Sequence, residues 1–321
     1  MVEINVLDIG ARYGIHPSWK SFEYIGNFYL VEADSSEAKR LRKKYKKFKN
    51  IKVFSNAISH QDQILKINIL KNPAMSGSQI RNSLSPLYWD QRKTQTKIIK
   101  TIEVKALSLD NFVKKLKVKI NFLKIDVEGQ EFSILNSSKK VVRDLLGIRC
   151  EVNFLNIFEN SKNYSGSFVD IHDFLVKNNF ILINLDYDGV GDHYSSYVLN
   201  NQKRGILQNT DAVWIKKSFL SNKINEQDSI IKIAIFLFLN NAPDLAIWIL
   251  LKNSKRFSKY RLYKNTKTYQ FLHASLAAHF YKLKWAPGQS LRRHKIIFES
   301  ILNETFPDMN LYNESKLFNP A

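Results

Sequence analysis

The chain has 321 residues, of which 44% are hydrophobic and 24% charged, a composition typical of globular proteins. This length predicts one large domain, residues 1–220, followed by a smaller one, residues 221–321. A single cysteine, Cys150, excludes an intrachain disulfide and a cysteine-based zinc site and indicates a reducing, cytoplasmic compartment. The formal charge of +20 is spread over both parts. It suits anionic membranes, phosphorylated substrates or nucleic acid, unless the lysine excess only reflects a Lys-rich proteome.

An apolar run near the N-terminus leads into a glycine-containing turn. Residues 4–9 end at Gly10, and Gly14 follows four residues later. The pattern is typical of a buried strand that enters a tight turn, where the backbone approaches a ligand closely. Asp8 lies just before this turn. Because the chain enters this strand almost at once, we expect no signal peptide.

A second predicted strand, residues 28–31, ends in Glu32. An acidic residue at this position of a βαβ unit can accept hydrogen bonds from both hydroxyls of a ribose. Position 17, where a dinucleotide fingerprint has its third glycine, is Pro17, so no pyrophosphate cradle is expected. The sequence therefore favours S-adenosylmethionine over NAD. Asn56 and Ala57, which follow a third strand at residues 51–54, are expected near the adenine.

The middle of the chain alternates between helix and strand patterns. Ser35 is expected to cap a helix that reaches about residue 47, and Ser108 opens another that reaches about residue 116. Strand patterns at 63–72 and 98–104 flank a polar loop of about 25 residues, a length typical of a lid or binding loop. Further on, we expect a helix at 168–177 and an antiparallel last pair of strands, 180–185 and 211–215, which completes a seven-stranded sheet.

The most informative stretch is Ile120 to Glu131. Its apolar run ends at Asp126, and Gly129 is expected to start a helix. Three carboxylates, those of Asp126, Glu128 and Glu131, fall within six residues at the C-terminal end of a central strand, where open α/β sheets bind ligands. The next strand, residues 147–154, carries Glu151 in an otherwise apolar run.

Beyond residue 221 the pattern is helical only. Helices are expected at 230–240, 245–252, 269–281 and 291–303, with Asp244 beginning the second. The first two are apolar enough to suggest a membrane span, but Lys232, Asn240 and Pro243 interrupt the run. We therefore expect a packed helical bundle of unknown role.

The two motifs together resemble those of the FkbM-type S-adenosylmethionine-dependent methyltransferases. The resemblance rests on Leu7-Asp8-Ile9-Gly10-Ala11-Arg12-x-Gly14, Trp19, Glu32, Leu123-Lys124-Ile125-Asp126-Val127-Glu128-Gly129-x-Glu131 and Glu151, and it covers about residues 4–216. Members more often have Asn at the position of Arg12. The resemblance implies an α/β fold of the class I methyltransferase (Rossmann-like) type, with a C-terminal helical extension outside it. It also implies O-methylation of hydroxyls on sugars or secondary metabolites.

Carried over by position, the resemblance also assigns a cofactor site for S-adenosylmethionine. Gly10, Arg12 and Gly14 would face its methionine part, with Asp8 beside them, and Glu32 would bind the ribose. Asn56 and Ala57 would lie at the adenine, and Asp126 would point toward the cofactor's amino group and the reacting methyl.

Methyl transfer to a sugar hydroxyl also needs a group that removes the hydroxyl proton. The candidates for this base are Asp126 first, then Glu128 and His172. Glu151 and Asn153 could instead join Asp126 around a divalent ion. We prefer a structural role for Glu151, paired with a nearby Lys or Arg, and assign no metal.

Three functions compete. The leading hypothesis is a sugar O-methyltransferase acting on a glycan, a glycolipid precursor or a nucleotide-linked sugar. For this enzyme we expect a carbohydrate or sugar-phosphate acceptor and a cytoplasmic location. We also expect peripheral contact with the anionic inner membrane face or with glycan-synthesis proteins. An RNA 2′-O-methyltransferase would use Asp126 and Glu151 in a Lys-Asp-Lys-Glu set, but no aromatic-rich RNA-binding module is evident. The third is a non-catalytic, cofactor-binding adaptor. The oligomeric state stays open.

Overall fold

The computed structural model describes residues 2–81, 94–159, 164–186, 209–220 and 227–253. The chain divides into two compact units, one of residues 4–217 and one of residues 1–3 with 218–321. Several predictions lie outside the described residues: the loop between the last two predicted strands, from Tyr187 to Arg204, the helices at 269–281 and 291–303, and Tyr88, Trp89 and Arg92 of the polar loop.

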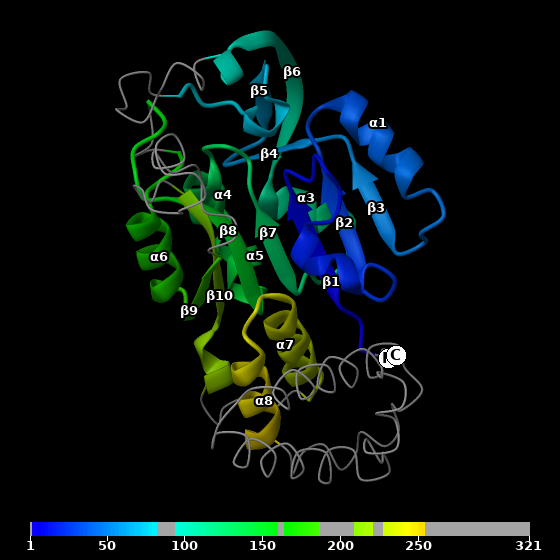
Figure 1. Cartoon of the computed structure of the whole chain (residues 1–321), viewed down its shortest axis with the longest axis vertical. Coiled ribbons are helices and arrows are strands. Elements are labelled where there is room, and N and C mark those ends of the chain that lie inside the picture. Colours follow the sequence, from blue (N-terminus) through cyan, green and yellow to red (C-terminus); the bar gives the residue numbers. More distant parts are fainter. Residues whose placement is uncertain (1, 82–93, 160–163, 187–208, 221–226, 254–321) are drawn as a thin grey trace, which may run out of the picture. The chain divides into compact units, whose positions relative to one another are not determined.

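Seven strands form the main sheet of the first unit, in the order β3-β2-β1-β7-β8-β10-β9 (Figure 1). Five run parallel: β1 (Asn5–Ile9), β2 (Asn27–Val31), β3 (Ile51–Phe54), β7 (Phe122–Ile125) and β8 (Gly147–Asn153). The last two, β9 (Phe180–Asp186) and β10 (Asn209–Lys216), pair antiparallel, with β10 inserted beside β8. This confirms the predicted seven-stranded, mostly parallel sheet. The strand order reverses between β1 and β7, which is where such sheets bind ligands.

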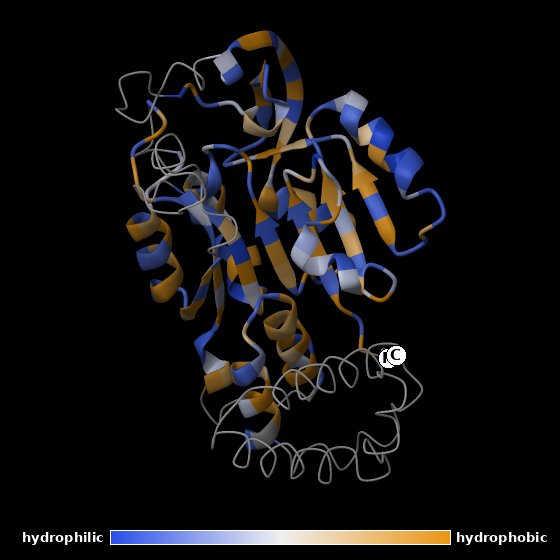
Figure 2. Ribbon diagram, viewed as in Figure 1, coloured by the Kyte–Doolittle hydropathy of each residue, from blue (hydrophilic) through white to orange (hydrophobic). Residues whose placement is uncertain are grey.

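One face of the main sheet is covered by four helices. They are α3 (Leu109–Leu116), α4 (Glu131–Ser137), α5 (Lys139–Asp144) and α6 (Phe168–Lys177). Alternate residues of the strands, such as Leu7, Leu123 and Ile148, form one core with these helices and are completely buried. Figure 2 shows these strands as mostly hydrophobic, as expected for a parallel sheet covered on both faces.

The opposite face is covered near β1 and β2 by a 3-10 helix, η1 (Pro17–Phe22), and by α1 (Ser35–Lys44). The ring of Trp19 packs against those of Phe28 and Phe122, with centroids 6.4 and 6.1 Å apart. The outer face of α1 is strongly hydrophilic in Figure 2. Its N-cap is Asp34, whose Oδ1 accepts a hydrogen bond from the Ser36 amide at 3.0 Å, so the prediction of Ser35 as the cap was wrong by one residue.

A second, three-stranded sheet was not predicted as a separate layer. It is formed by β4 (Ala57–Ser59), β6 (Ile98–Ser108) and β5 (Gln63–Leu70), with β6 in the middle, and a 3-10 turn, η2 (Pro73–Met75), follows β5. The predicted strands at 63–72 and 98–104 are thus present. Their inward residues bury a core of their own around Ile67 and Ile69.

In the second unit, α7 (Gln227–Leu239) and α8 (Pro243–Lys252) form the predicted helical hairpin after a 3-10 turn, η5 (Lys217–Leu220). Pro243 rather than Asp244 begins α8, which suits proline because its missing N–H is not needed in the first turn. Among the described residues, every helix is too short or too polar to cross a bilayer.

Candidate active site

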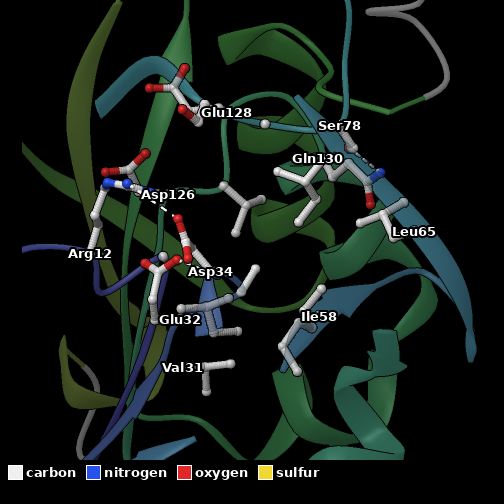
Figure 3. A pocket seen from close by; sticks show the side chains of 18 of the residues that line it. Arg12, Val31, Glu32, Asp34, Ile58, Leu65, Ser78, Asp126, Glu128 and Gln130 are labelled. Carbon is white, nitrogen blue, oxygen red and sulfur yellow. Dashed lines mark hydrogen bonds and ion pairs between the residues drawn. The ribbon is translucent and has the colours of Figure 1, made fainter. Parts of the chain in front are cut away.

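A cavity of about 260 Å³ opens at the carboxyl ends of β1, β2 and β7, beneath the small sheet. One wall is apolar and includes Val31, Ile58 and Leu65, whereas acidic side chains gather on the other side (Figure 3). Most of the predicted cofactor residues line it: Gly10, Arg12, Glu32, Asn56, Ala57 and Asp126. Glu128 and Glu151 line it as well, whereas Asp8, Gly14 and His172 do not.

The two sequence motifs meet at Gly10. Its backbone has a φ of +84°, and a Cβ built on it would lie 1.7 Å from the carbonyl oxygen of Asp126. The Asp126 amide donates to the carbonyl of Ile9 at 3.1 Å. Only glycine fits this contact, so the N-terminal turn and the end of β7 form one continuous floor of the cavity.

Glu32 lies at the tip of β2 and is 5% exposed. Its Oε1 accepts a hydrogen bond from the Asp34 amide at 2.7 Å, and burial raises the pKa of Glu32 above its ordinary value. Arg12 lies next to the pair, its guanidinium 3.5 Å from Oδ2 of Asp34 (Figure 3). A carboxylate held in this way can still accept hydrogen bonds from a diol in the cavity.

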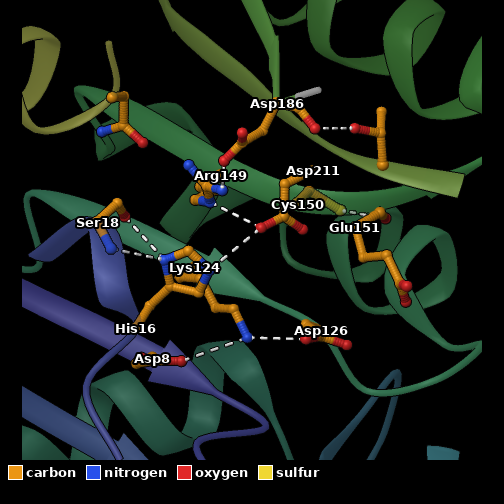
Figure 4. Close-up of polar contacts among 12 residues, drawn as sticks. Asp8, His16, Ser18, Lys124, Asp126, Arg149, Cys150, Glu151, Asp186 and Asp211 are labelled. Atoms are coloured by element: carbon orange, nitrogen blue, oxygen red, sulfur yellow. Dashed lines mark hydrogen bonds and ion pairs between the residues drawn. The ribbon is translucent and has the colours of Figure 1, made fainter. Parts of the chain in front are cut away.

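A buried lysine supports Asp126 from below. Nζ of Lys124 lies 3.0 Å from Oδ2 of Asp126 and 3.8 Å from Oδ1 of Asp8 (Figure 4). Burial alone would lower the pKa of Lys124, but the charges of Asp126 and Asp8 outweigh it and raise that pKa. Asp8 therefore contacts this ammonium group and does not line the cavity.

Further charged side chains lie next to this group, on β8 and β10. The Arg149 guanidinium donates to Oδ2 of Asp211 at 2.8 Å and also pairs with Asp186 (Figure 4). Nε2 of His16 lies 3.4 Å from the same Asp211 oxygen. Burial would raise the pKa of Asp211, but His16 and Arg149 hold it well below its usual range. No residue spacing in the sequence indicates that His16 belongs to this network.

The loop between β7 and α4 has a strained conformation that Glu131 stabilises. Glu128 has a φ of +57° and Gly129 a φ of +108°, so two successive residues are left-handed. Oε1 of Glu131 accepts a hydrogen bond from the Val127 amide at 2.8 Å, and Oε2 accepts one from the Gly129 amide at 3.1 Å. The helix therefore begins at Glu131, and the prediction that Gly129 starts it was wrong because this glycine is needed in the turn.

Gln130 is buried and links three segments through side-chain hydrogen bonds, a role that the sequence did not reveal. Its Oε1 accepts a hydrogen bond from the Ser59 hydroxyl at 3.0 Å, and its Nε2 donates to the Ser78 hydroxyl at 2.6 Å. It thus joins the β7–α4 loop to β4 and to the polar loop after η2. A Cβ on Gly77 would lie 2.7 Å from the Glu128 carbonyl, so this part of the polar loop packs tightly over the cavity.

Glu128 is paired with Arg81 of the same polar loop, whose guanidinium donates to Oε2 of Glu128. Burial and the neighbouring carboxylates raise the pKa of Glu128 to about 8, although Arg81 opposes the shift. The prediction of a ligand-covering loop is therefore supported for the described residues up to Arg81, several of which line the cavity.

Glu151, on β8, is half-buried and also lines the cavity. Its Oε1 accepts a hydrogen bond from the side-chain amide of Asn209, at the start of β10. In the part of the chain that the structure describes, no Lys or Arg forms an ion pair with it, contrary to the preferred prediction. Burial, together with the charges of Glu128 and Asp126, raises the pKa of Glu151 well above its ordinary value.

His172, the third candidate base, lies on α6 and not at the cavity. Nε1 of Trp214 donates to its Nδ1 at 3.3 Å, and its ring stacks on that of Phe168. Its ring is thus used in packing α6 against β10, and the structure does not support a catalytic role for it.

Oxygens of Asp126, Glu131 and Glu151 lie within 4.8 Å of one another, a spacing that a metal ion could bridge. However, Glu131 already accepts two backbone amides and Asp126 already faces the Lys124 ammonium group. Asn153, the other suggested ligand, is buried on β8. The donors present therefore suit hydrogen bonds better than a cation, and no metal is assigned.

The family model described as "Methyltransferase FkbM domain" matches residues 8–182, more than half of the chain. The chain belongs to the FkbM methyltransferase family. This FkbM protein is thus an S-adenosylmethionine-dependent methyltransferase, as the motifs predicted. A comparison with curated proteins found no match.

Solved structures share only the outline of the fold with this FkbM protein. TrmK of M. capricolum, with bound S-adenosylhomocysteine, is 13% identical to this chain. The match covers 85% of this chain and 87% of TrmK, with a TM-score of 0.35. Sp1610 of Streptococcus pneumoniae, described as a candidate tRNA (m1A22) methyltransferase, is 9% identical to this chain. The match covers 94% of this chain and 93% of Sp1610, with a TM-score of 0.33. A SAM-dependent methyltransferase of Aquifex aeolicus is 10% identical to this chain. The match covers 67% of this chain and 84% of the Aquifex protein, with a TM-score of 0.31. Such low similarity carries no information about the acceptor.

The residues of the cavity fit S-adenosylmethionine. Glu32 suits the ribose diol, the apolar wall suits the adenine, and the carboxylates around Asp126 suit a sulfonium cation. When bound, this cofactor supplies an activated methyl group.

Proposed function

We propose that the protein O-methylates a hydroxyl of a sugar in a glycan, a glycolipid precursor or a nucleotide-linked sugar. The supporting observation is that Asp126, Glu128 and Glu151 line the same cavity as Glu32. Sugar hydroxyls are hydrogen-bond donors, and carboxylates accept such bonds strongly. The acidic side of the cavity is therefore suited to position a polyol and to accept a proton from it.

An RNA 2′-O-methyltransferase is the rival enzyme. Lys124, next to Asp126, supplies a lysine that the sequence alone could not place. It is 4% exposed and shared with Asp8, so it has little access to an acceptor. The carboxylates at the cavity would also repel a phosphodiester backbone. These two features favour the sugar over RNA.

Basic residues near the cavity suggest where an acceptor's phosphate, or the anionic inner membrane face, would bind. The outer face of α1 is hydrophilic and carries exposed cationic side chains: Lys39, Arg40, Lys43 and Lys44. We propose that this face attracts sugar phosphates or glycolipid precursors to a cytoplasmic enzyme, in keeping with a role in polysaccharide biosynthesis.

Transfer of radiolabelled methyl from S-adenosylmethionine tests the proposal. The protein is incubated with nucleotide sugars, extracted glycolipids, polysaccharide and total RNA. Label that enters a carbohydrate fraction and survives mild alkali, as an ether does and an ester does not, supports the proposal. Label in RNA alone would overturn it. Binding of S-adenosylmethionine without label in any fraction would favour the non-catalytic adaptor, and failure to bind it at all would leave only a scaffold.

A further inference from the structure

The cavity contains several carboxylates, but most of them are already committed to cations or amides. Asp126 faces the Lys124 ammonium group at 3.0 Å. Glu128 is held by the Arg81 guanidinium. An ion pair of this kind occupies part of the carboxylate and fixes it in place, so it is less available to accept a hydrogen bond from an acceptor hydroxyl.

Glu151 differs from both. It is half-buried at the cavity, and among the described residues no Lys or Arg forms an ion pair with it. Its Oε1 accepts a hydrogen bond from the Asn209 side chain, a neutral donor that orients the carboxylate without adding positive charge. Ile125 of β7 pairs with Cys150 of β8, so Asp126 and Glu151, the next residues, extend side by side at the cavity.

Burial and the main charged groups near Glu151 all raise its pKa. Burial disfavours its charged form most, followed by the carboxylates of Glu128 and Asp126 and then by those of Glu131 and Asp211. Besides burial, the largest electrostatic influences on Glu151 therefore come from carboxylates, and Asn209, which donates to it, is neutral. Two cations on neighbouring segments, Lys124 and Arg81, are paired with Asp126 and Glu128. In such surroundings the carboxylate has a high affinity for a proton.

We infer that Glu151 is the general base that removes the proton of the acceptor hydroxyl. This inference rests on the proposed function. The acceptor oxygen forms a bond to the methyl carbon, the carbon–sulfur bond of the cofactor breaks, and its electron pair stays on sulfur. The hydroxyl proton passes to a carboxylate oxygen of Glu151, which later releases it to water. Asp126 keeps its ion pair with Lys124 beside it.

The first test uses the acceptor identified by the methyl-transfer assay. Glu151→Gln keeps the size of the side chain and should lower kcat by about 10²–10⁴-fold, the usual contribution of a general base. Calorimetry should show that its affinity for S-adenosylmethionine changes by less than about threefold. Glu103→Gln, at an exposed glutamate of β6, is the matched control and should keep full activity. A Glu151→Gln variant with wild-type kcat would overturn the inference.

The pH profile separates a base from a merely structural residue. The kcat of the wild-type enzyme should fall at low pH, as Glu151 becomes protonated, and Glu151→Asp should keep this dependence with a lower maximum. Glu151→Gln should lose the acidic limb. Activity that disappears with EDTA and returns with Mg²⁺ would make Glu151 a metal ligand and overturn the assignment as base.

A second readout needs no acceptor and stays decisive if none of the sugars is methylated. Infrared difference spectra of wild type minus Glu151→Gln, with S-adenosylhomocysteine bound, report the protonated carboxyl band of this residue. A midpoint well above the ordinary glutamate value supports the base, whereas a midpoint near the ordinary value of about 4.3 contradicts it. The inference and the proposed function can therefore fail separately.

Discussion

The carbonyl oxygen of Asp126 lies where a side chain on Gly10 would have to be, 1.7 Å from an ideal Cβ. Through this contact the turn after β1 and the end of β7 support each other. The cofactor turn and the acidic end of the cavity are therefore one structural unit, although they are far apart in the sequence.

Gly10→Ala should disrupt this unit. Both its φ of +84° and the contact with Asp126 oppose a side chain, so we expect a loss of at least about 2 kcal/mol in the free energy of unfolding. Affinity for S-adenosylmethionine should fall with it. Urea unfolding and calorimetry measure the two effects, and a variant that keeps wild-type values in both would show that the backbones are not this close.

Removing the buried ammonium group should be more harmful than removing an exposed one. Lys124→Met leaves Asp126 and Asp8 without their shared cation, which should cost about 3–5 kcal/mol. The matched control is Lys66→Met, because Lys66 is 75% exposed and forms a surface pair with Glu103 at 3.9 Å. Its cost should not exceed about 1 kcal/mol. Equal effects in urea unfolding would argue against the buried network.

The sheet could be predicted because each of its strands has a local apolar signal. The separate three-stranded sheet could not, since the periodicity of residues 63–70 and 98–108 indicates strands but not their partners. The acidic positions were likewise visible, but their roles depend on contacts between distant residues. Arg81 reaches Glu128, and Asn209 rather than a cation reaches Glu151. His172 was a wrong candidate because its chemistry is suitable while its place on α6 is not.

Glu32 should contribute to cofactor affinity. Glu32→Ala removes an acceptor for the ribose hydroxyls, and hydrogen bonds to a charged group contribute about 1.5–3 kcal/mol. The dissociation constant for S-adenosylhomocysteine should therefore rise by about 10–150-fold. Glu37→Ala, which removes the half-buried ion-pair partner of Arg40 on α1, serves as the control and should leave the dissociation constant unchanged. Calorimetry that finds the two variants alike would place the ribose elsewhere.

Glu131 should make stability depend on pH. Burial raises its pKa to about 7 in the folded protein, above the ordinary value of about 4.3. Between these values the unfolded chain has lost this proton while the folded protein retains it, so the free energy of unfolding decreases as pH rises. Relative to Glu131→Gln, the wild type should lose up to about 1.4 kcal/mol per pH unit in this window. If the free energies of unfolding of wild type and Glu131→Gln change with pH in the same way from about pH 4 to 8, the raised pKa is contradicted.

The most direct test of the account is a crystal structure of the protein with S-adenosylhomocysteine. We predict that the ribose hydroxyls donate to Glu32, that the adenine packs against the wall containing Ile58 and Leu65, and that the sulfur faces the carboxylates of Asp126 and Glu151. An S-adenosylhomocysteine molecule bound away from Glu32, or a cavity that stays empty at saturating ligand, would contradict it.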